Sequence, residues 1–213
     1  MVFGKIEYLN LLPFHVFMKR FTKGSSAKMS MEYKKSVPSE INKLFASRRV
    51  DAAFISSIKA KKYAHVNLGI IAKKNVQSVL VIPSKVSKTD KESASSNVLA
   101  KILGINGEVI IGDKALKYTL SNDNYIDLAE EWNKKYNLPF VFALLCYHKE
   151  KKLYQKIEKK FLEKKVKIPR YILQKASLQT GVEEKEILKY LTLISYKLNA
   201  KSKQSIKKFY NNL

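Results

Sequence analysis

Short apolar runs that end in polar residues alternate with amphipathic segments through the first half of this chain, and this alternation limits the fold class. The clearest run is residues 51–57, Asp-Ala-Ala-Phe-Ile-Ser-Ser, which predicts a buried strand ending in two serines. Further strands are expected at residues 27–33 and 108–113, and helices at 36–48, 93–103 and 128–136, the first of them capped by Ser36 or Ser39. Strands that alternate with helices of this length are typical of an α/β fold.

The opening segment, residues 4–14, runs from a strand pattern into Asn10 and then into a helix. Pro13 favours the first helical turn, where its missing N–H leaves no hydrogen bond unsatisfied. We therefore expect Asn10 at the carboxyl end of the first strand, beside free backbone N–H groups that suit an anion. A plain capping role for Asn10 is equally open.

Two long apolar segments predict that the chain crosses between two lobes and returns. Residues 76–83, which contain Ser78, are expected to form the outgoing strand, and residues 139–145 the returning one. The predicted lobe one comprises residues 1–79 and 143–213, and lobe two comprises residues 80–142. From residue 148 onward, apolar spacing near 3.6 predicts helices at 149–164, 168–181 and 182–198, followed by a basic terminal helix.

Metal and disulfide chemistry are not expected. The single cysteine, Cys146, lies in an apolar strand and is predicted to be a core residue. The three histidines are isolated from one another and from carboxylate clusters, so neither a metal nor a cofactor is predicted. Asp113, at the end of a predicted strand, is expected to have a structural role.

The formal net charge of +23 raises the question of a polyanionic partner. The basic residues are spread along the whole chain and are nearly all lysine, and motifs typical of RNA-binding proteins are missing. We therefore predict no nucleic-acid partner, since the same positive field also steers a small anionic substrate. The longest apolar runs fall short of the roughly 20 residues that a membrane span needs. With no secretory signal visible, a cytoplasmic protein without a membrane partner is predicted.

Hydroxyl groups gather where the predicted strands face a cleft. The residues are Ser56, Ser57, Ser78, Ser95 and Ser96. Each has an ordinary alternative role as a cap or turn residue. Together with Asn10 they predict a pocket that binds carboxylates.

Several segments carry a more specific pattern, and they follow one another in a fixed order. They are Tyr-Leu-Asn-Leu-Leu-Pro-Phe at 8–14, the run at 51–57, Val-Gln-Ser-Val-Leu at 76–80, Ser-Ala-Ser-Ser-Asn-Val-Leu at 93–99 and Ile-Ile-Gly-Asp-Lys-Ala-Leu at 110–116. In this order they resemble the chorismate dehydratases of the futalosine route of menaquinone biosynthesis. The sister family, dihydroxynaphthoate synthase, has a functional histidine in an Ile-His-Glu segment, where this chain has Asp113.

The resemblance implies a two-lobed fold like that of type II periplasmic binding proteins. It also implies a cytoplasmic lyase, a hydro-lyase without cofactor, that converts chorismate to 3-[(1-carboxyvinyl)oxy]benzoate and water. Carried over by motif, Asn10 and Ser78 are the catalytic residues, and Ser56, Ser57, Ser95 and Ser96 contact the substrate carboxylates. The alternatives are a non-catalytic binding protein for a small carboxylate, the sister enzyme, and a nucleic-acid-binding protein.

Overall fold

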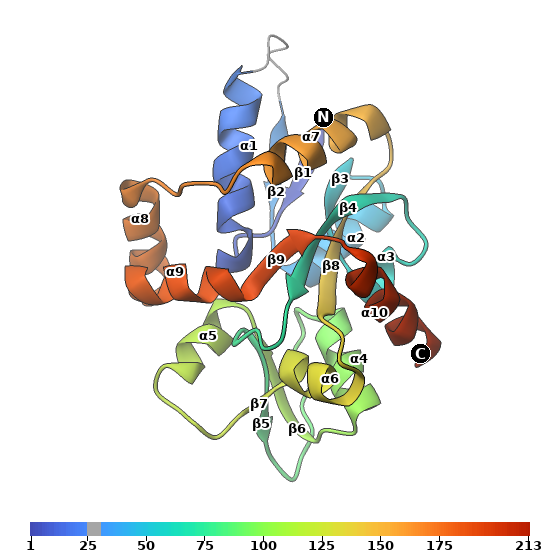
Figure 1. Cartoon of the computed structure of the whole chain (residues 1–213), viewed down its shortest axis with the longest axis vertical. Helices are drawn as coiled ribbons and strands as arrows, with labels where there is room; N and C mark the ends of the chain where they lie inside the picture. The colour runs from blue at the N-terminus through green and yellow to red at the C-terminus, as the bar shows by residue number, and fades with distance from the viewer. Residues whose placement is uncertain (25–30) are drawn as a thin grey trace.

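Two β-sheets of unequal size organise the chain in the computed structural model, which describes residues 1–24 and 31–213 (Figure 1). The larger sheet has the strand order β2-β1-β3-β8-β4-β9 and the smaller sheet the order β6-β5-β7. The strands of the larger sheet are β1 (Val2–Lys5), β2 (Glu32–Lys35), β3 (Ala52–Ser56), β4 (His65–Ala72), β8 (Phe140–Tyr147) and β9 (Ile194–Lys197). The smaller sheet contains β5 (Val79–Pro83), β6 (Gly107–Ile111) and β7 (Ile126–Asp127).

The strand directions make both sheets part of an α/β architecture. β1 runs parallel to β2 and β3, whereas β8 runs antiparallel to both β3 and β4, and β4 is antiparallel to β9. In the smaller sheet β5 pairs antiparallel with β6 and with β7. The predicted α/β class is confirmed.

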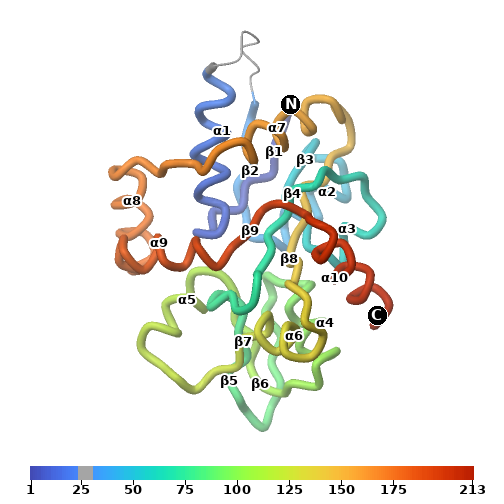
Figure 2. The backbone as a smooth tube through the Cα atoms, in the orientation of Figure 1, coloured from blue at the N-terminus to red at the C-terminus, as the bar shows by residue number. Residues whose placement is uncertain are grey.

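Helices surround each sheet, as the tube in Figure 2 shows most clearly. Around the larger sheet lie the single-turn 3₁₀ helix η1 (Leu9–Leu11), α1 (Leu12–Gly24), α2 (Pro38–Ala46), α3 (Ser57–Ala60), α7 (Lys151–Glu163), α8 (Arg170–Thr180), α9 (Glu184–Leu193) and α10 (Ala200–Asn211). The smaller sheet carries α4 (Ala94–Leu103), α5 (Asp113–Thr119) and α6 (Leu128–Tyr136). Within residues 1–24 and 31–213, no helix has the length and apolarity that crossing a membrane requires.

Aromatic rings join α1 and α7 to the larger sheet. The ring centroid of Phe14 on α1 lies 5.0 Å from that of Phe54 on β3 and 5.2 Å from that of Phe161 on α7. Phe14 and Phe54 are almost fully buried. Edge-to-face pairs of this kind add roughly 0.5–1.5 kcal/mol each to the free energy of burial. This core holds the segment that leads from β1 through η1 into α1.

Trp132, on α6, joins the smaller part of the molecule to the larger one. Its indole is fully buried and lies 5.2 Å from the ring of Phe140, at the start of β8. The indole Nε1–H donates to Ser205 Oγ on α10 at 3.0 Å. Trp132 therefore ties α6 to the C-terminal helix.

The outgoing strand predicted at residues 76–83 is wrong in its first half. β4 ends at Ala72 and β5 begins only at Val79, so Ser78 lies in the connection between the two sheets. Gln77 has a φ of 58°, a left-handed conformation that cannot continue an extended strand. The returning segment is an unbroken strand, but β8 pairs only within the larger sheet. The division into lobes at residues 79/80 and 142/143 stays a prediction.

The helix predicted at residues 182–198 is also wrong at its end. α9 stops at Leu193, and residues 194–197, Ile-Ser-Tyr-Lys, form β9 against β4. Isoleucine and tyrosine favour a strand, and the edge of β4 offers them a partner. This change of structure places Tyr196 on the sheet.

Three further expectations at element ends are corrected. The strand predicted at residues 27–33 is β2 at 32–35, and residues 25–30 lie outside the described part. Neither Ser36 nor Ser39 caps α2: Val37 occupies the cap position without a side-chain bond, and Pro38 fills the first turn. Asp113 does not end a strand, because β6 stops at Ile111 and Asp113 begins α5.

Candidate active site

A cavity of about 70 Å³ lies between the two sheets and collects most of the predicted site residues. Its walls include Asn10, Ser56, Ser78, Ser95 and Ser96. Ser78, Ser95 and Ser96 are each 2% exposed, so this side of the cavity is buried. The structure thus brings together five of the six residues that sequence singled out.

Ser57, the sixth residue, lies behind the wall of the cavity. It is fully buried at the start of α3, and its hydroxyl is 3.0 Å from Ser95 Oγ. Its backbone oxygen accepts a hydrogen bond from Tyr210 Oη at 2.8 Å. In this arrangement Ser57 orients Ser95, and a direct contact between Ser57 and a ligand stays a prediction.

Asn10 lies in η1, several residues after β1 ends, rather than directly at the strand end. Its segment is anchored from two sides. The Leu9 backbone N–H donates to Asp113 Oδ1 at 3.0 Å, and Tyr196 Oη donates to the Asn10 carbonyl oxygen at 2.7 Å. These bonds occupy the backbone and leave the Asn10 side chain at the cavity.

The other serines are held by their own partners. At the end of β3, Asn42 Nδ2 donates to Ser56 Oγ at 2.8 Å, and Asn42 Oδ1 accepts the Ser56 N–H at 3.1 Å. Ser93 caps α4: its hydroxyl accepts the Ser96 N–H at 3.1 Å and donates to Ser96 Oγ at 2.7 Å. Fixed hydroxyls of this kind need little reorganisation when an anion binds.

Ser78 has a partner that sequence reasoning missed. Tyr190 on α9 is 2% exposed, and its Oη donates to Ser78 Oγ at 2.8 Å. Burial is the main cause that raises the pKa of Tyr190 above the ordinary tyrosine range. Residues 182–198 gave no sequence signal for this contact, because the apolar spacing of α9 predicts only a buried face.

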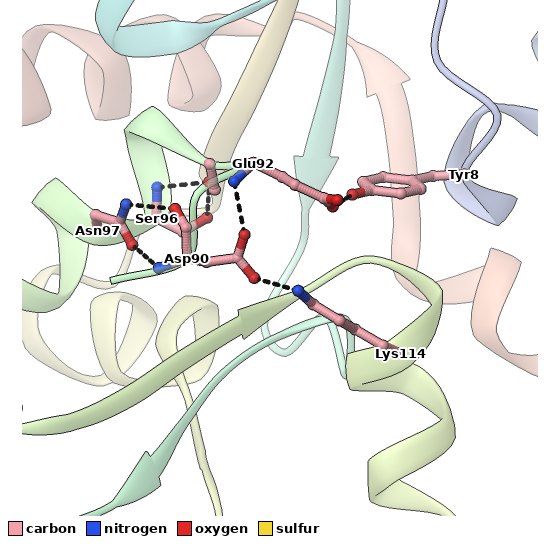
Figure 3. A network of polar contacts seen from close by, with 7 residues as sticks. Tyr8, Asp90, Glu92, Ser96, Asn97 and Lys114 are labelled. Carbon is pink, nitrogen blue, oxygen red and sulfur yellow. Dashed lines mark hydrogen bonds and ion pairs between the residues drawn. The ribbon is translucent and has the colours of Figure 1, made fainter. Parts of the chain in front are cut away.

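Tyr8 was also missed, and it connects the two sheets. It follows β1 and donates through Oη to the carboxylate of Glu92, in the loop before α4 (Figure 3). The ring lies against Gly112, whose φ is +72°, and a Cβ there would come within 2.7 Å of Tyr8 Cζ. Only glycine allows this approach, so Tyr8 and Gly112 close one side of the cavity.

The loop that carries Glu92 is itself braced by Asp90. Asp90 Oδ1 accepts the Glu92 N–H at 2.8 Å, and Asp90 Oδ2 forms a 2.7 Å ion pair with Lys114 on α5 (Figure 3). Asn97 on α4 accepts the Asp90 N–H at 2.9 Å and donates to the Asp90 carbonyl oxygen at 2.8 Å. Glu92 is therefore presented to Tyr8 by a rigid loop.

Ionisable groups near the site have shifted pKa values. Burial raises the pKa of Asp113 to about 6, and the hydrogen bond from Leu9 opposes this rise. Burial also raises the pKa of the Cys146 thiol to about 12, and Cys146 is fully buried on β8, as its predicted core role requires. The expected structural role of Asp113 fits its bond to the Leu9 N–H.

The described residues that line this cavity include no histidine, carboxylate or thiol that could bind a metal. Among the described residues that line it, Tyr8 is the only titratable side chain. His15 bonds Ile6 O through Nε2 at 2.8 Å, and His148 stacks on Phe45 at 4.0 Å between ring centroids. No group of three or more potential metal ligands occurs within residues 1–24 and 31–213.

Solved structures similar to this chain share its fold at low sequence identity. Protein AF1704 from Archaeoglobus fulgidus has a TM-score of 0.72 at 10% identity, over 99% of this chain and 95% of that one. The alkanesulfonate-binding protein SsuA from Xanthomonas axonopodis pv. citri, bound to MOPS, has a TM-score of 0.62 at 11% identity, over 99% and 90%. A Candida albicans protein described as having the generic periplasmic binding protein fold has a TM-score of 0.56 at 13% identity, over the same shares. The predicted periplasmic-binding-protein-like fold is confirmed.

Sequence comparison is more specific than the fold. A family model described as menaquinone biosynthesis matches residues 1–107 and 104–213. The chorismate dehydratase of Campylobacter jejuni subsp. jejuni serotype O:23/36 (strain 81-176) is 47% identical over 213 residues, which are 98% of this chain and 96% of that protein. The chain therefore belongs to the menaquinone biosynthesis family.

Proposed function

We propose that this protein is a chorismate dehydratase, a hydro-lyase that converts chorismate to 3-[(1-carboxyvinyl)oxy]benzoate and water in menaquinone biosynthesis. The observation that carries the proposal is its 47% identity, over 98% of the chain, to a chorismate dehydratase. The same proposal makes it a cytoplasmic enzyme that needs no cofactor and no nucleic-acid or membrane partner.

The chemistry of the cavity supports a dicarboxylate ligand. Chorismate carries two carboxylates, and the hydroxyls of Ser56, Ser95 and Ser96 line the cavity as hydrogen-bond donors. The net charge of +23 attracts such a dianion from solution. We assign these serines to the substrate carboxylates, with Ser57 acting through Ser95.

The mechanism must remove a proton without an ordinary protein base. The described residues around the cavity include no carboxylate or histidine, and burial raises the pKa of Tyr8 above its usual range. The base is therefore the enolpyruvyl carboxylate of the substrate itself, which takes the proton from C3. The C3–H electron pair enters the ring, the C4–O bond breaks, and the leaving hydroxyl takes the proton that the carboxylate removed from C3 and departs as water. The ring becomes aromatic, which drives the reaction forward.

Asn10 and Ser78 act on the charge that develops during this step. The C3 proton is vinylogous to the ring carboxylate, so its loss builds a dienolate-like anion that preorganised donors stabilise. One such donor is worth about 3–4 kcal/mol in comparable sites. Asn10 orients the enolpyruvyl side chain or bonds the leaving hydroxyl, and closure of the cavity excludes water.

Incubation of the purified protein with chorismate in metal-free buffer, followed by chromatography of the products, tests the proposal. A no-enzyme control corrects for spontaneous rearrangement and loss of pyruvate. Formation of 3-[(1-carboxyvinyl)oxy]benzoate is the expected result. Chorismate that binds to the folded protein but stays unchanged would instead indicate a binding protein. The cavity contains no histidine among its described residues, which argues against the sister enzyme dihydroxynaphthoate synthase.

A further inference from the structure

Tyr190 lies directly behind Ser78, on the side away from the cavity. Its hydroxyl is 2.8 Å from Ser78 Oγ, and the side chain is almost fully buried. Ser78 lines the cavity, so it separates Tyr190 from any ligand. Tyr190 can therefore influence a ligand only through Ser78 or a neighbouring wall residue.

The phenolic O–H of Tyr190 donates its hydrogen bond to Ser78. Burial keeps Tyr190 protonated at neutral pH, because its pKa lies above the ordinary range. The Tyr190 O–H therefore stays available to donate to Ser78 Oγ, at 2.8 Å.

This arrangement sets the direction of the hydrogen bonds at the cavity. A serine hydroxyl that accepts a bond from behind has its own proton left to donate. Donors arranged in such a chain polarise one another and strengthen the last bond.

We propose that Tyr190 is a positioning residue that fixes Ser78 as a hydrogen-bond donor toward the bound ligand. The inference rests on the proposed function, in which Ser78 and Asn10 act on chorismate. Tyr190 transfers no proton in this scheme, since that would leave a buried phenolate behind Ser78. Its contribution is orientation.

Tyr190→Phe keeps the buried ring and removes only the hydroxyl. We expect kcat for chorismate to fall about 10-fold, the scale of one lost hydrogen bond, while KM changes less than about twofold. The matched control is Tyr154→Phe, because Tyr154 on α7 is also buried and its hydroxyl donates to the Met1 sulfur, at 3.0 Å, rather than to a residue that lines the cavity. This control is expected to keep the wild-type kcat. Equal rates for wild-type and Tyr190→Phe would overturn the inference.

A double-mutant cycle with Ser78→Ala separates orientation from general packing. If Tyr190 acts through Ser78, Tyr190→Phe should change turnover less than about twofold in the Ser78→Ala background. A full 10-fold loss in that background would assign Tyr190 a merely structural role and overturn the inference.

The affinity for chorismate, measured by calorimetry on wild-type, Tyr190→Phe, Ser78→Ala and the double variant, tells a failure of this inference apart from a failure of the proposed function. If wild-type binds chorismate without turnover, the proposed function fails. In that case the double-mutant cycle is evaluated on the affinity for chorismate. Non-additive losses of affinity at Tyr190 and Ser78 would support the inference, and additive losses would overturn it. Wild-type protein that neither binds nor converts chorismate overturns both.

Discussion

At the scale of single residues, Asn10 and Ser78 contribute different polar groups to one cavity without holding the core together. Replacing either by alanine should lower kcat for chorismate by roughly 10²–10³, the cost of losing one preorganised donor. The thermal midpoint should change little, because the bonds from the Leu9 N–H to Asp113 and from Tyr196 to the Asn10 carbonyl oxygen remain. Steady-state kinetics with Ser84→Ala, an exposed serine on the loop after β5, as control would check this. Near-normal turnover in either variant would remove that residue from the mechanism.

A second residue-scale prediction concerns Asp113 and pH. Its pKa is raised to about 6 in the folded protein, so ionised Asp113 costs stability above that pH. The cost disappears as the pH falls from 6 toward 4, where the unfolded chain also takes up the proton. Asp113→Asn, which stays neutral, should therefore be more stable than wild-type at pH 8, by about 1–3 kcal/mol, and equally stable near pH 4. Urea unfolding at both pH values measures this difference. A less stable variant at pH 8 would show that the Leu9 bond needs a charged acceptor.

At the scale of elements, Asp127 joins the start of α6 to the segment that carries Ser78. One carboxylate oxygen accepts the N–H groups of Ala129 and Glu130, at 2.9 and 3.1 Å. The other accepts those of Val76 and Gln77, at 2.8 and 2.7 Å. An asparagine can accept on one side only, because its NH₂ group faces donors on the other.

Asp127→Asn should therefore lose two of these four bonds and destabilise the protein by about 2–5 kcal/mol. We also expect a lower kcat, since Ser78 directly follows the released segment. Denaturant unfolding and kinetics check both effects, and Asp123→Asn, on the exposed loop before β7, is the matched control. A variant as stable as that control would contradict the bridging role.

The same two elements show where sequence reasoning succeeds and where it stops. The helix at residues 128–136 was predicted correctly because Asp127, a strong capping residue, and the helical pattern both mark its start. The strand at 76–83 was misjudged because its first half is apolar enough for a sheet. What interrupts it is Asp127, 50 residues away in the sequence. Local patterns carry no information about such distant acceptors.

The candidate site likewise contains residues that the sequence indicates and residues that it does not. Asn10 and the serines stand out because they follow apolar runs or start helices, and five of the six line the cavity. Tyr190 reaches the site from the buried face of α9, whereas Tyr196 lies on β9 because the chain changes from helix to strand at residue 194. That change depends on pairing with β4, a tertiary interaction that helical periodicity hides.

At the scale of the whole molecule, the cavity lies between the two sheets and is lined by residues from both. A ligand that contacts both walls favours a form in which the parts around the two sheets lie close together. Contacts across the cavity therefore bias the equilibrium between open and closed forms. Tyr8 to Glu92 is such a contact, because it joins the segment after β1 to the loop before α4.

Breaking this contact should weaken ligand binding more than chemistry. Tyr8→Phe keeps the ring against Gly112, and Glu92→Ala removes the acceptor. We expect each to raise KM for chorismate about 5–30-fold, since a lost part-buried bond of about 1–2 kcal/mol shifts the closing equilibrium by that factor. The double variant should be no worse than the single ones, because both changes remove one bond. Glu108→Ala is the control, since Glu108 pairs with Lys88 beside the smaller sheet and does not cross the cavity. Additive effects in the double variant would mean that Tyr8, which also lines the cavity, acts on the ligand independently of Glu92.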